Sequence, residues 1–362
     1  DPITREPKGL LIEESRANLI TYSEDFANAA WNDFRSSSLL SNAAVAPDGT
    51  LTADKLVEAA ATATHFVQRV TSVTISSGTT YAVTLYAKAA GRNFLQILPD
   101  AAGGVLGGYT TIDLTNGTVS ALGSGTTASV SAVGNGWYRC SFVATSSGTT
   151  ARPGIGMSTD AGTGAGSFKS YTGDGFSGIF IWGIQIEAGA FPTSYIPTVA
   201  SAVTRAADAA SMTGTNFSSW YNQAQGTFYT EFVLPAYPEN ASINQVALGL
   251  GTANNDLFSG VVQIDGRSSV GYLQPTGASN IGTPVANTLQ KVSVTSGNSQ
   301  SAAINGTVRA SSAFNRLYSY DRLGIGNWGR AITYQYPLNG YIRKITYYPV
   351  RLPNAELQEM TA

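Results

Sequence analysis

Few side chains in this sequence could carry out acid–base or nucleophilic chemistry. There is one histidine, His65, and one cysteine, Cys140, so a histidine-dependent triad has a single candidate base and an internal disulfide framework is excluded. A zinc site built on cysteines is excluded for the same reason. His65 is expected at a strand edge or on the surface. Cys140 alternates with Tyr138 and Phe142, and is therefore expected to be a small buried residue.

The carboxylates are scattered rather than paired. A glycosidase needs two carboxylates that face each other across a cleft. In the C-terminal half Glu231, Glu239, Asp256 and Asp265 fall in separate predicted elements, and the chain has no Gly-x-Ser-x-Gly elbow or phosphate-binding loop. Hydrolysis is therefore the less favoured hypothesis, and a pair of carboxylates assembled from distant segments stays open as an alternative.

Aromatic residues next to polar ones offer a different chemistry. A flat ring packs on the apolar side of a sugar, and polar side chains bond to its hydroxyl groups. The predicted strands 81–88 and 137–143 each place one aromatic and one cationic side chain on a shared face. If these strands are neighbours, six side chains would line one groove: Gln68, Tyr86, Lys88, Gln96, Trp137 and Arg139.

Each aromatic candidate has a structural alternative. Trp137 would instead belong to the core of a sandwich, and Arg139 would be a solvated side chain. Trp182, inside an apolar run, is expected in the core. A second set of candidate contact residues lies in a polar loop flanked by glycines and just after it. The structural alternative is that the tryptophan of this loop packs over a sheet edge or in a subunit contact. This set consists of Trp328, Arg330 and Tyr334.

The elements that must position these residues are short strands. Glycine occurs 39 times and charged residues make up 12%, against a usual share of roughly 25%. The apolar run 179–186 predicts a buried strand, after which Pro192 and Pro197 force an extended exit. We predict an all-β fold of two antiparallel β-sandwich domains with a short C-terminal helix. The predicted boundaries are 1–198 for the first domain, 199–210 for a linker and 211–362 for the second.

Local signals place several turns and helices. Asn-Gly or Asp-Gly pairs at 116–117, 135–136, 265–266 and 305–306 predict hairpin turns. The glycine-rich stretch 154–166 is expected to be a loop, and Ser23 is expected to cap a helical turn. Residues 354–360 predict one amphipathic helix.

Charge and hydropathy exclude two classes of partner. The formal net charge is −2, so no broad basic field is present to hold nucleic acid. No apolar run reaches the length that a membrane span requires. We therefore expect no nucleic-acid partner and no membrane insertion.

Eight stretches of the sequence are distinctive as a set: GLLIEESRANL (9–19), YSEDF (22–26), PDGT (47–50), ADKL (53–56), GWYR (136–139), WGIQIE (182–187), TSYIP (193–197) and VTRAAD (203–208). Together they resemble a module common in bacteriophage and prophage tail-fibre and structural proteins, which looks like a jelly-roll carbohydrate-binding module. The C-terminal part resembles concanavalin A-like (laminin G-like) domains in GYIRKITYYP (340–349) and AELQ (355–358).

The resemblance implies a non-catalytic, carbohydrate-binding part of a phage or phage-like tail fibre or spike. Such a protein would lie on the virion surface, act outside the cell, contact host cell-surface polysaccharide and assemble as a homotrimer. Two alternatives stay open, namely a structural or oligomerisation module of the fibre without glycan binding, and a polysaccharide-degrading glycosidase. Fold likeness by itself does not decide among them.

The same resemblance implies a position for a metal ion. No cofactor is required, but jelly-roll carbohydrate modules often hold a structural Ca²⁺ between the first segment and the last strand. Oxygen ligands suit this ion. In this sequence Glu24, Asp25 and Glu187 would supply them.

Overall fold

The chain forms strands almost throughout. The computed structural model describes residues 6–31, 33–99, 107–161, 167–234, 245–252, 258–265, 269–274, 277–282, 284–296, 299–313, 319–327 and 337–362. Within these residues the helical elements are short: η1 (Ala29–Trp31), α1 (Thr215–Ser218) and α2 (Asn354–Thr361). None of the helices in this described part could cross a bilayer.

The chain folds into two units, each with its own core. The first unit is Arg16–Arg205, and the second combines Pro7–Ser15 with Ala206–Ala362. Two of the passages of the chain between the units fall at 15/16 and at 205/206. The second crossing falls inside the linker predicted at 199–210.

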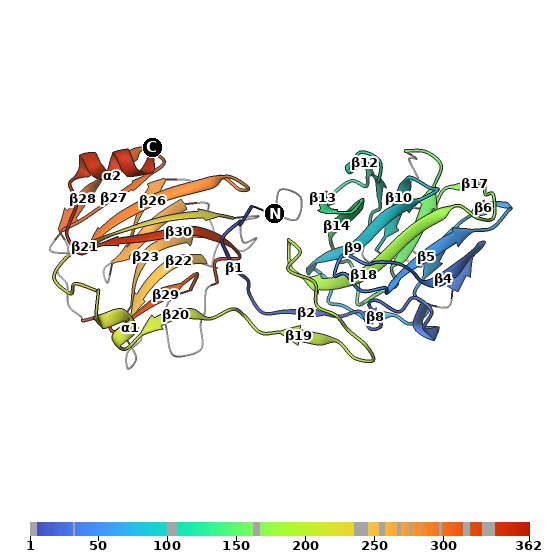
Figure 1. Ribbon diagram of the computed structural model, residues 1–362, viewed down its shortest axis with the longest axis horizontal. Coiled ribbons are helices and arrows are strands. Elements are labelled where there is room, and N and C mark those ends of the chain that lie inside the picture. Colours follow the sequence, from blue (N-terminus) through green and yellow to red (C-terminus); the bar gives the residue numbers. More distant parts are fainter. Residues whose placement is uncertain are drawn as a thin grey trace. The chain divides into compact units, whose positions relative to one another are not determined.

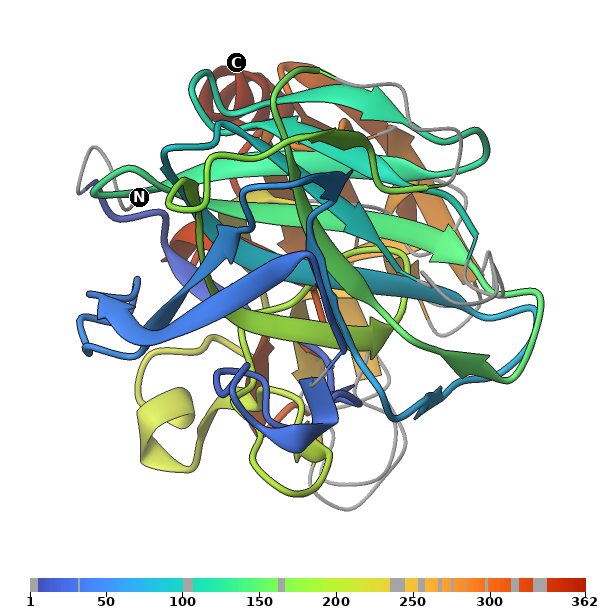
Figure 2. The ribbon, with the colours of Figure 1, turned by 90° about the vertical axis from the view of Figure 1, so that its right-hand side faces the viewer.

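The first unit is a sandwich of two antiparallel sheets (Figure 1; Figure 2). Sheet I has the order β13 (Thr127–Gly134), β14 (Trp137–Thr145), β9 (Thr80–Ala90), β18 (Gly178–Ala188), β5 (Ala53–Glu58) and β4 (Ser37–Ala44). Sheet II has the order β12 (Thr118–Leu122), β11 (Thr110–Asp113), β10 (Phe94–Leu98), β16 (Gly154–Ser158), β7 (Phe66–Gln68) and β3 (Asp33–Arg35). Three ribbons complete the unit: β8 (Val73–Thr74) with β15 (Thr150–Ala151), β6 (Thr62–Thr64) with β17 (Ser170–Thr172), and β2 (Arg16–Asn18) with β19 (Val203–Arg205).

Alternation along the strands builds the core of the first unit. Leu85 and Phe142 of sheet I and Leu95 and Ile97 of sheet II are all fully buried in one apolar cluster. Because successive side chains of a strand point to opposite faces, the residues between them point away from this core. Each sheet therefore has an outer face, and polar or aromatic residues gather on it.

The second unit is also a sandwich of antiparallel sheets. One sheet has the order β1 (Leu10–Ile12), β30 (Gly340–Tyr348), β21 (Gly226–Val233), β26 (Leu289–Ser296), β27 (Ser299–Ile304) and β28 (Thr307–Ala313). The other has the order β20 (Ala210–Thr213), β29 (Arg322–Ile325), β22 (Gln245–Gly251), β23 (Phe258–Asp265), β24 (Ser269–Gln274) and β25 (Gly277–Gly282). The all-β fold of two sandwiches and the C-terminal helix are confirmed.

The N-terminal segment differs from the predicted domain boundary. Residues 7–15 were assigned to the first domain, but β1 pairs with β30 of the second unit, Leu10 opposite Ile342. Ile12 is 1% exposed and lies in the second core. At Gly326 an added Cβ would come within 2.5 Å of Ile12 Cγ1, so this glycine makes room for it. A three-residue apolar run could form an edge strand of either sandwich, so the sequence alone does not assign it to one domain.

The predicted hairpin turns agree with the structure where it describes them. Asn135 and Gly136 join β13 to β14 with φ values of 53° and 78°. Asn305 and Gly306 join β27 to β28 with φ values of 46° and 77°. Such turns need positive φ at both central residues, which Asn-Gly supplies. Gly266 of the predicted Asp265-Gly266 turn lies outside the described residues.

Two local predictions are wrong. The stretch 154–166 was expected to be a loop, but its first part is β16 in the interior of sheet II. Gly156 allows the ring of Phe168 to lie against the strand, where an added Cβ would be 2.5 Å from Cδ1. Ser23 caps no helix; its backbone N–H and hydroxyl both donate to the carbonyl oxygen of Thr198. Gly156 and Ser23 make tertiary contacts, and a local sequence pattern does not predict such contacts.

Candidate functional site

The outer face of sheet I brings together four of the predicted contact residues. Leu85 and Ala87 of β9 are in the core, so Tyr86 and Lys88 point away from it. The register pairs Arg139 of β14 with Tyr86. Directly opposed residues of neighbouring strands point to the same side. The two predicted strands are therefore neighbours, and Trp137, two residues before Arg139, shares their face.

A row of side chains crosses this face from β4 to β9. Phe180 of β18 pairs with Lys55 of β5 on one side and with Lys88 on the other. Leu40 of β4 pairs with Lys55 and extends the row to the edge of the sheet. With strands about 4.8 Å apart, the Cα atoms of the two lysines lie about 10 Å apart across Phe180. We call Leu40, Lys55, Phe180 and Lys88 the Phe180 row.

Neither lysine of the row pairs with a carboxylate of the described residues. Lys55 Nζ donates to the carbonyl oxygen of Phe176 over 2.9 Å, a neutral acceptor that uses one of three ammonium donors. The stem of Lys88 runs along Gly136, where an added Cβ would lie 3.4 Å from Lys88 Cε. Within the described residues, no carboxylate oxygen lies within 4.0 Å of either Nζ.

An aromatic cluster lies beside the row. Tyr86 packs edge-on against Trp182, with ring centroids 5.3 Å apart, and Trp182 lies 4.8 Å from Tyr195. Phe180 approaches Trp137 at 6.5 Å. Burial raises the pKa of Tyr86, because the phenolate would lose water. The aromatic cluster therefore packs against the Phe180 row on one side, where Phe180 approaches Trp137.

The two tryptophans of this face are enclosed by the chain itself. Trp137 is 2% and Trp182 4% exposed. Trp137 Nε1 donates to the carbonyl of Val45 over 3.1 Å, and Trp182 Nε1 donates to Thr52 Oγ1 over 3.0 Å. The connection between β4 and β5 therefore covers both rings. Trp182 is buried in a hydrophobic core cluster, as expected, and Trp137 belongs to the same cluster, which agrees with the structural alternative for this residue rather than with an open sugar-facing ring.

Arg139 is half-buried next to Tyr86. Its Cζ lies 5.8 Å from the Tyr86 ring centroid, and one terminal nitrogen donates to the carbonyl oxygen of Thr193. Nε of Arg139 is buried and has no hydrogen-bond partner among the described residues. Arg139 thus fastens the segment after β18 to the outer face and contributes positive charge to it.

Gln68 and Gln96 do not belong to this face. Their neighbours Val67 and Leu95 are in the core, so both glutamines point to the outer face of sheet II. Gln96 Oε1 accepts the backbone N–H of Lys169 over 3.0 Å. Both side chains are buried, Gln68 at 7% and Gln96 at 1% exposure. The six residues predicted to line one groove are therefore divided between opposite faces of the sandwich.

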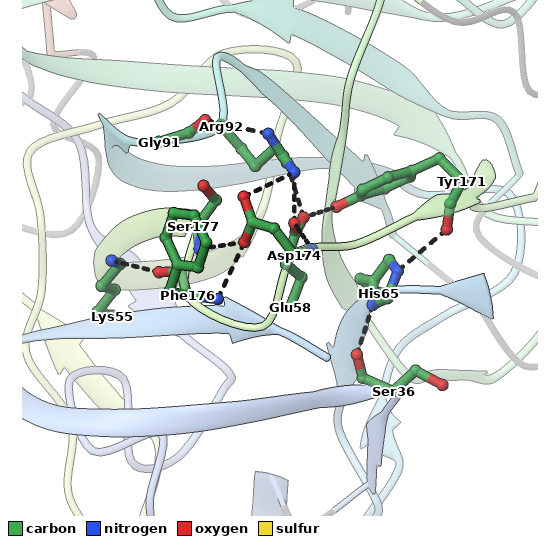
Figure 3. A network of polar contacts seen from close by, with 10 residues as sticks. All are labelled: Ser36, Lys55, Glu58, His65, Gly91, Arg92, Tyr171, Asp174, Phe176 and Ser177. Atoms are coloured by element: carbon green, nitrogen blue, oxygen red, sulfur yellow. Dashed lines mark hydrogen bonds and ion pairs between the residues drawn. The ribbon is translucent and has the colours of Figure 1, made fainter. Parts of the chain in front are cut away.

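A buried polar network lies at the end of β5 (Figure 3). The Glu58 side chain is fully buried and accepts from Arg92 Nε at 2.7 Å, from the Tyr171 hydroxyl at 2.6 Å and from the backbone N–H of Asp174 at 2.7 Å. A second Arg92 nitrogen bonds to Glu58 and also lies 3.2 Å from Asp174 Oδ2. Burial and the bond to Glu58 raise the pKa of Tyr171, so its proton stays in place.

This network holds the loop 173–177 that joins β17 to β18. Asp174 Oδ1 accepts the N–H groups of Phe176 and Ser177 at 2.9 and 2.7 Å. Lys55 bonds to the Phe176 carbonyl from the other side, as Figure 3 shows. Phe176 itself is 70% exposed. A large aromatic side chain is thus presented to solvent by a fixed backbone next to the Phe180 row, a feature that no local sequence motif indicated.

His65 is buried rather than at the surface. Its side chain is 0% exposed, and its two ring nitrogens face the carbonyl oxygens of Ser36 at 2.5 Å and Tyr171 at 3.3 Å. The sequence predicts a strand-edge or surface position, but the ring packs against Tyr171 of β17, with ring centroids 4.6 Å apart. His65 therefore links segments of the first unit instead of serving as an accessible base.

The residues of the implied calcium site have other partners. Glu187 is buried and accepts from Gln185 Nε2 at 2.8 Å and from the backbone N–H and hydroxyl of Thr193 at 2.7 and 2.6 Å. Glu24 accepts from the Tyr195 hydroxyl at 3.1 Å, and Asp25 is exposed. Among the residues that the structure describes, no group of three or more His, Cys, Asp or Glu side chains could hold a metal ion. The donor set Glu24, Asp25 and Glu187 therefore does not fit a calcium ion.

The candidates of the second unit cannot be placed. Trp328, Arg330 and Tyr334 lie outside the described residues. The candidate site is therefore the outer face of sheet I, with the Phe180 row and Phe176 as its exposed part.

Comparisons with known proteins identify no family. No family model matches the sequence, and no curated protein matches it. Among solved structures, the chain is similar to the NanB sialidase from Streptococcus pneumoniae, with a TM-score of 0.35 and 11% identity over 41% of this chain and 26% of that chain. A Trypanosoma rangeli sialidase in complex with the inhibitor DANA gives a TM-score of 0.32 and 16% identity over 38% of this chain and 23% of that chain.

A smaller solved structure is matched over most of its length. The Ruminococcus gnavus IT-sialidase CBM40 bound to α2,3 sialyllactose gives a TM-score of 0.34 and 17% identity over 41% of this chain and 88% of that chain. In the sialidases the match spans about a quarter of the protein. At these TM-scores the similarity identifies neither a family nor an activity.

Proposed function

We infer that this chain is a non-catalytic, carbohydrate-binding part of a phage or phage-like tail fibre or spike, and that it binds host cell-surface polysaccharide. The observation that carries the binding role is the Phe180 row. There the half-buried Phe180 lies between two lysines that no described carboxylate neutralises, and Lys55 also contacts the backbone of the exposed Phe176. Aromatic faces pack on sugar rings, and ammonium donors bond to their polar groups.

The biological setting rests on the sequence resemblance alone. The phrases shared with tail-fibre modules support a position on the virion surface, activity outside the cell and assembly as a homotrimer. Nothing in this proposal requires nucleic acid, membrane insertion or a cofactor.

The arrangement of carboxylates supports binding rather than hydrolysis. Glu58 and Asp174 approach each other, but Arg92 lies between them and bonds to both. The oxygens of Glu58 are occupied by four donors, so this pair lacks the free acid and base that glycoside hydrolysis requires.

A structural module of the fibre is the second candidate. It is favoured by the burial of Trp31, Trp137 and Trp182, which leaves the described tryptophans of the first unit without a sugar-facing ring. In that case Phe176 and Phe180 would pack against another subunit instead of a glycan.

An array of purified bacterial capsular and O-antigen polysaccharides tests the proposal. The full chain should bind at least one member, and Phe180→Ala and Phe176→Ala should each weaken that binding about tenfold, by loss of a stacking contact. Leu122→Ala is the matched control, since Leu122 is 40% exposed on sheet II of the same unit. Absence of binding to every member, with intact folding, would favour the structural module. Release of reducing sugar ends from a bound polysaccharide would instead indicate an enzyme.

A further inference from the structure

The outer face of sheet I has an unbalanced charge. Lys55, Lys88 and Arg139 all point to this face. Glu187 is the strand carboxylate on the same face, and it is 0% exposed and bonded to Thr193 and Gln185. On the described strands of this face, the side chains that reach solvent therefore include cations and no carboxylate.

Carboxylates of the neighbouring segments are engaged elsewhere. Asp174 pairs with Arg92 and accepts two backbone N–H groups. Glu24 accepts from Tyr195, and Asp48 accepts from the backbone and hydroxyl of Thr50. Glu24 therefore lies on the Tyr195 side of this face. The ammonium groups of Lys55 and Lys88 thus have no carboxylate within 4.0 Å among the described residues.

The row combines this charge with fixed apolar surface. The half-buried ring of Phe180 belongs to the residue between Lys55 and Lys88 in the strand register. Phe176 is 70% exposed and accepts from Lys55 through its carbonyl oxygen, and Leu40 is 56% exposed and pairs with Lys55. The loop of Phe176 is held by Asp174, Arg92 and Lys55, so little backbone ordering is needed on binding. A ligand that matches the row has a ring with an apolar side and a negatively charged substituent.

We propose that the Phe180 row selects acidic saccharides. A sugar ring packs against Phe180 and Phe176, and its carboxylate, phosphate or sulfate group accepts hydrogen bonds from Lys88 and Lys55. Charge-assisted bonds of this kind are stronger than bonds between neutral groups. The assignment deepens the proposed function and rests on it, because it names the class of polysaccharide that the same face would bind.

The test uses the full chain and the polysaccharide array described above, with uronic-acid-bearing, phosphate-bearing and neutral members. Members that bind are assayed again after carboxyl reduction or after removal of phosphate or sulfate. Lys55→Gln and Lys88→Gln are compared with Lys169→Gln, which removes the same charge from the segment over sheet II and is paired with Asp160. Thermal unfolding checks that each variant is folded.

The expected result is that the bound members are acidic and that neutralising them abolishes binding. Each row variant should lose about tenfold in affinity, whereas Lys169→Gln should bind as the unchanged chain does. Affinity should also fall as salt is raised, because charge pairs at an exposed site are screened. Binding to neutral members with equal strength, or to neutralised derivatives, would overturn the acidic assignment and leave glycan binding intact. Binding to no member at all would overturn the proposed function instead.

Discussion

The hydroxyl of Tyr171 donates to Oε2 of Glu58 over 2.6 Å, inside a sandwich where the Glu58 carboxylate is closed off from water. Arg92 binds the same carboxylate, so the group is charged, buried and paired at once. The ion pair ties β5 to the loop that presents Phe176. The network therefore stabilises the first unit. It also fixes the backbone that presents the Phe176 ring to solvent.

Glu58→Gln should destabilise the first unit by about 1–3 kcal/mol, because the amide offers one acceptor oxygen where the buried carboxylate accepts from Arg92, Tyr171 and the backbone of Asp174. Cys140 is the chain's single cysteine and is fully buried in this unit, so its labelling by a thiol reagent in urea reports unfolding. Labelling should begin at lower urea in the variant. Asp160→Asn, which removes an exposed partner of Lys169, should cost no more than about 1 kcal/mol. Equal midpoints for the two variants would contradict the role of the network.

Ile12→Ala should destabilise the second unit and leave the first unchanged. The side chain is 1% exposed in the second core, and its loss should cost about 2–5 kcal/mol. Hydrogen exchange measured by mass spectrometry should show lower protection in peptides from 206–362 and unchanged protection in 16–205. Leu10→Ala on the same strand is the control, since Leu10 is 48% exposed. Lower protection confined to 16–205 would contradict the assignment of β1 to the second unit.

Asp54→Asn should flatten the dependence of the first unit's stability on acid pH. Burial raises the pKa of Asp54 from its usual 3.8 to about 6, although Asn42 and Phe26 donate backbone N–H groups to it. A folded-state pKa above the unfolded value means that the folded state binds the proton more tightly. The contribution is therefore fully present below the unfolded pKa and is lost as pH rises through about 6.

Urea unfolding between about pH 4 and pH 7 checks this expectation. The unchanged chain should lose free energy of unfolding across that interval, relative to the Asp54→Asn variant, whose amide side chain does not titrate. Asp160→Asn, at an exposed carboxylate, should keep the dependence of the unchanged chain. Parallel pH profiles for the unchanged chain and Asp54→Asn would rule out Asp54 as the titrating group.

Trp137→Phe should reduce stability modestly and leave glycan binding unchanged. The substitution removes the bond from Nε1 to the carbonyl of Val45, a loss of about 1 kcal/mol, while the ring stays under the β4–β5 connection. Affinity for an array-identified polysaccharide and the urea midpoint are the two measurements. A tenfold loss of affinity with an unchanged midpoint would restore Trp137 as a contact residue.

The sequence by itself determined the class of fold and many of its turns. Period-2 alternation in 81–88 and 137–143 predicted strands, and these became β9 and β14 in neighbouring positions. The Asn135-Gly136 and Asn305-Gly306 turns followed from positive φ, which is a local property of those residues. Local properties of this kind are encoded within a few residues, so they survive without knowledge of the tertiary structure.

Only the tertiary structure decided which residues share a face and which are covered. Alternation predicts that the side chains of Gln96 and Tyr86 point away from the core. It does not predict that they lie on opposite outer faces of the sandwich. The burial of Trp137 depends on Val45, which is 92 residues away in sequence, and the exposure of Phe176 depends on Glu58 and Arg92. Leu10–Ile12 likewise joins a sheet whose other strands begin more than 200 residues later. Exposure is set by such long-range packing, and a single sequence carries no local signal for it.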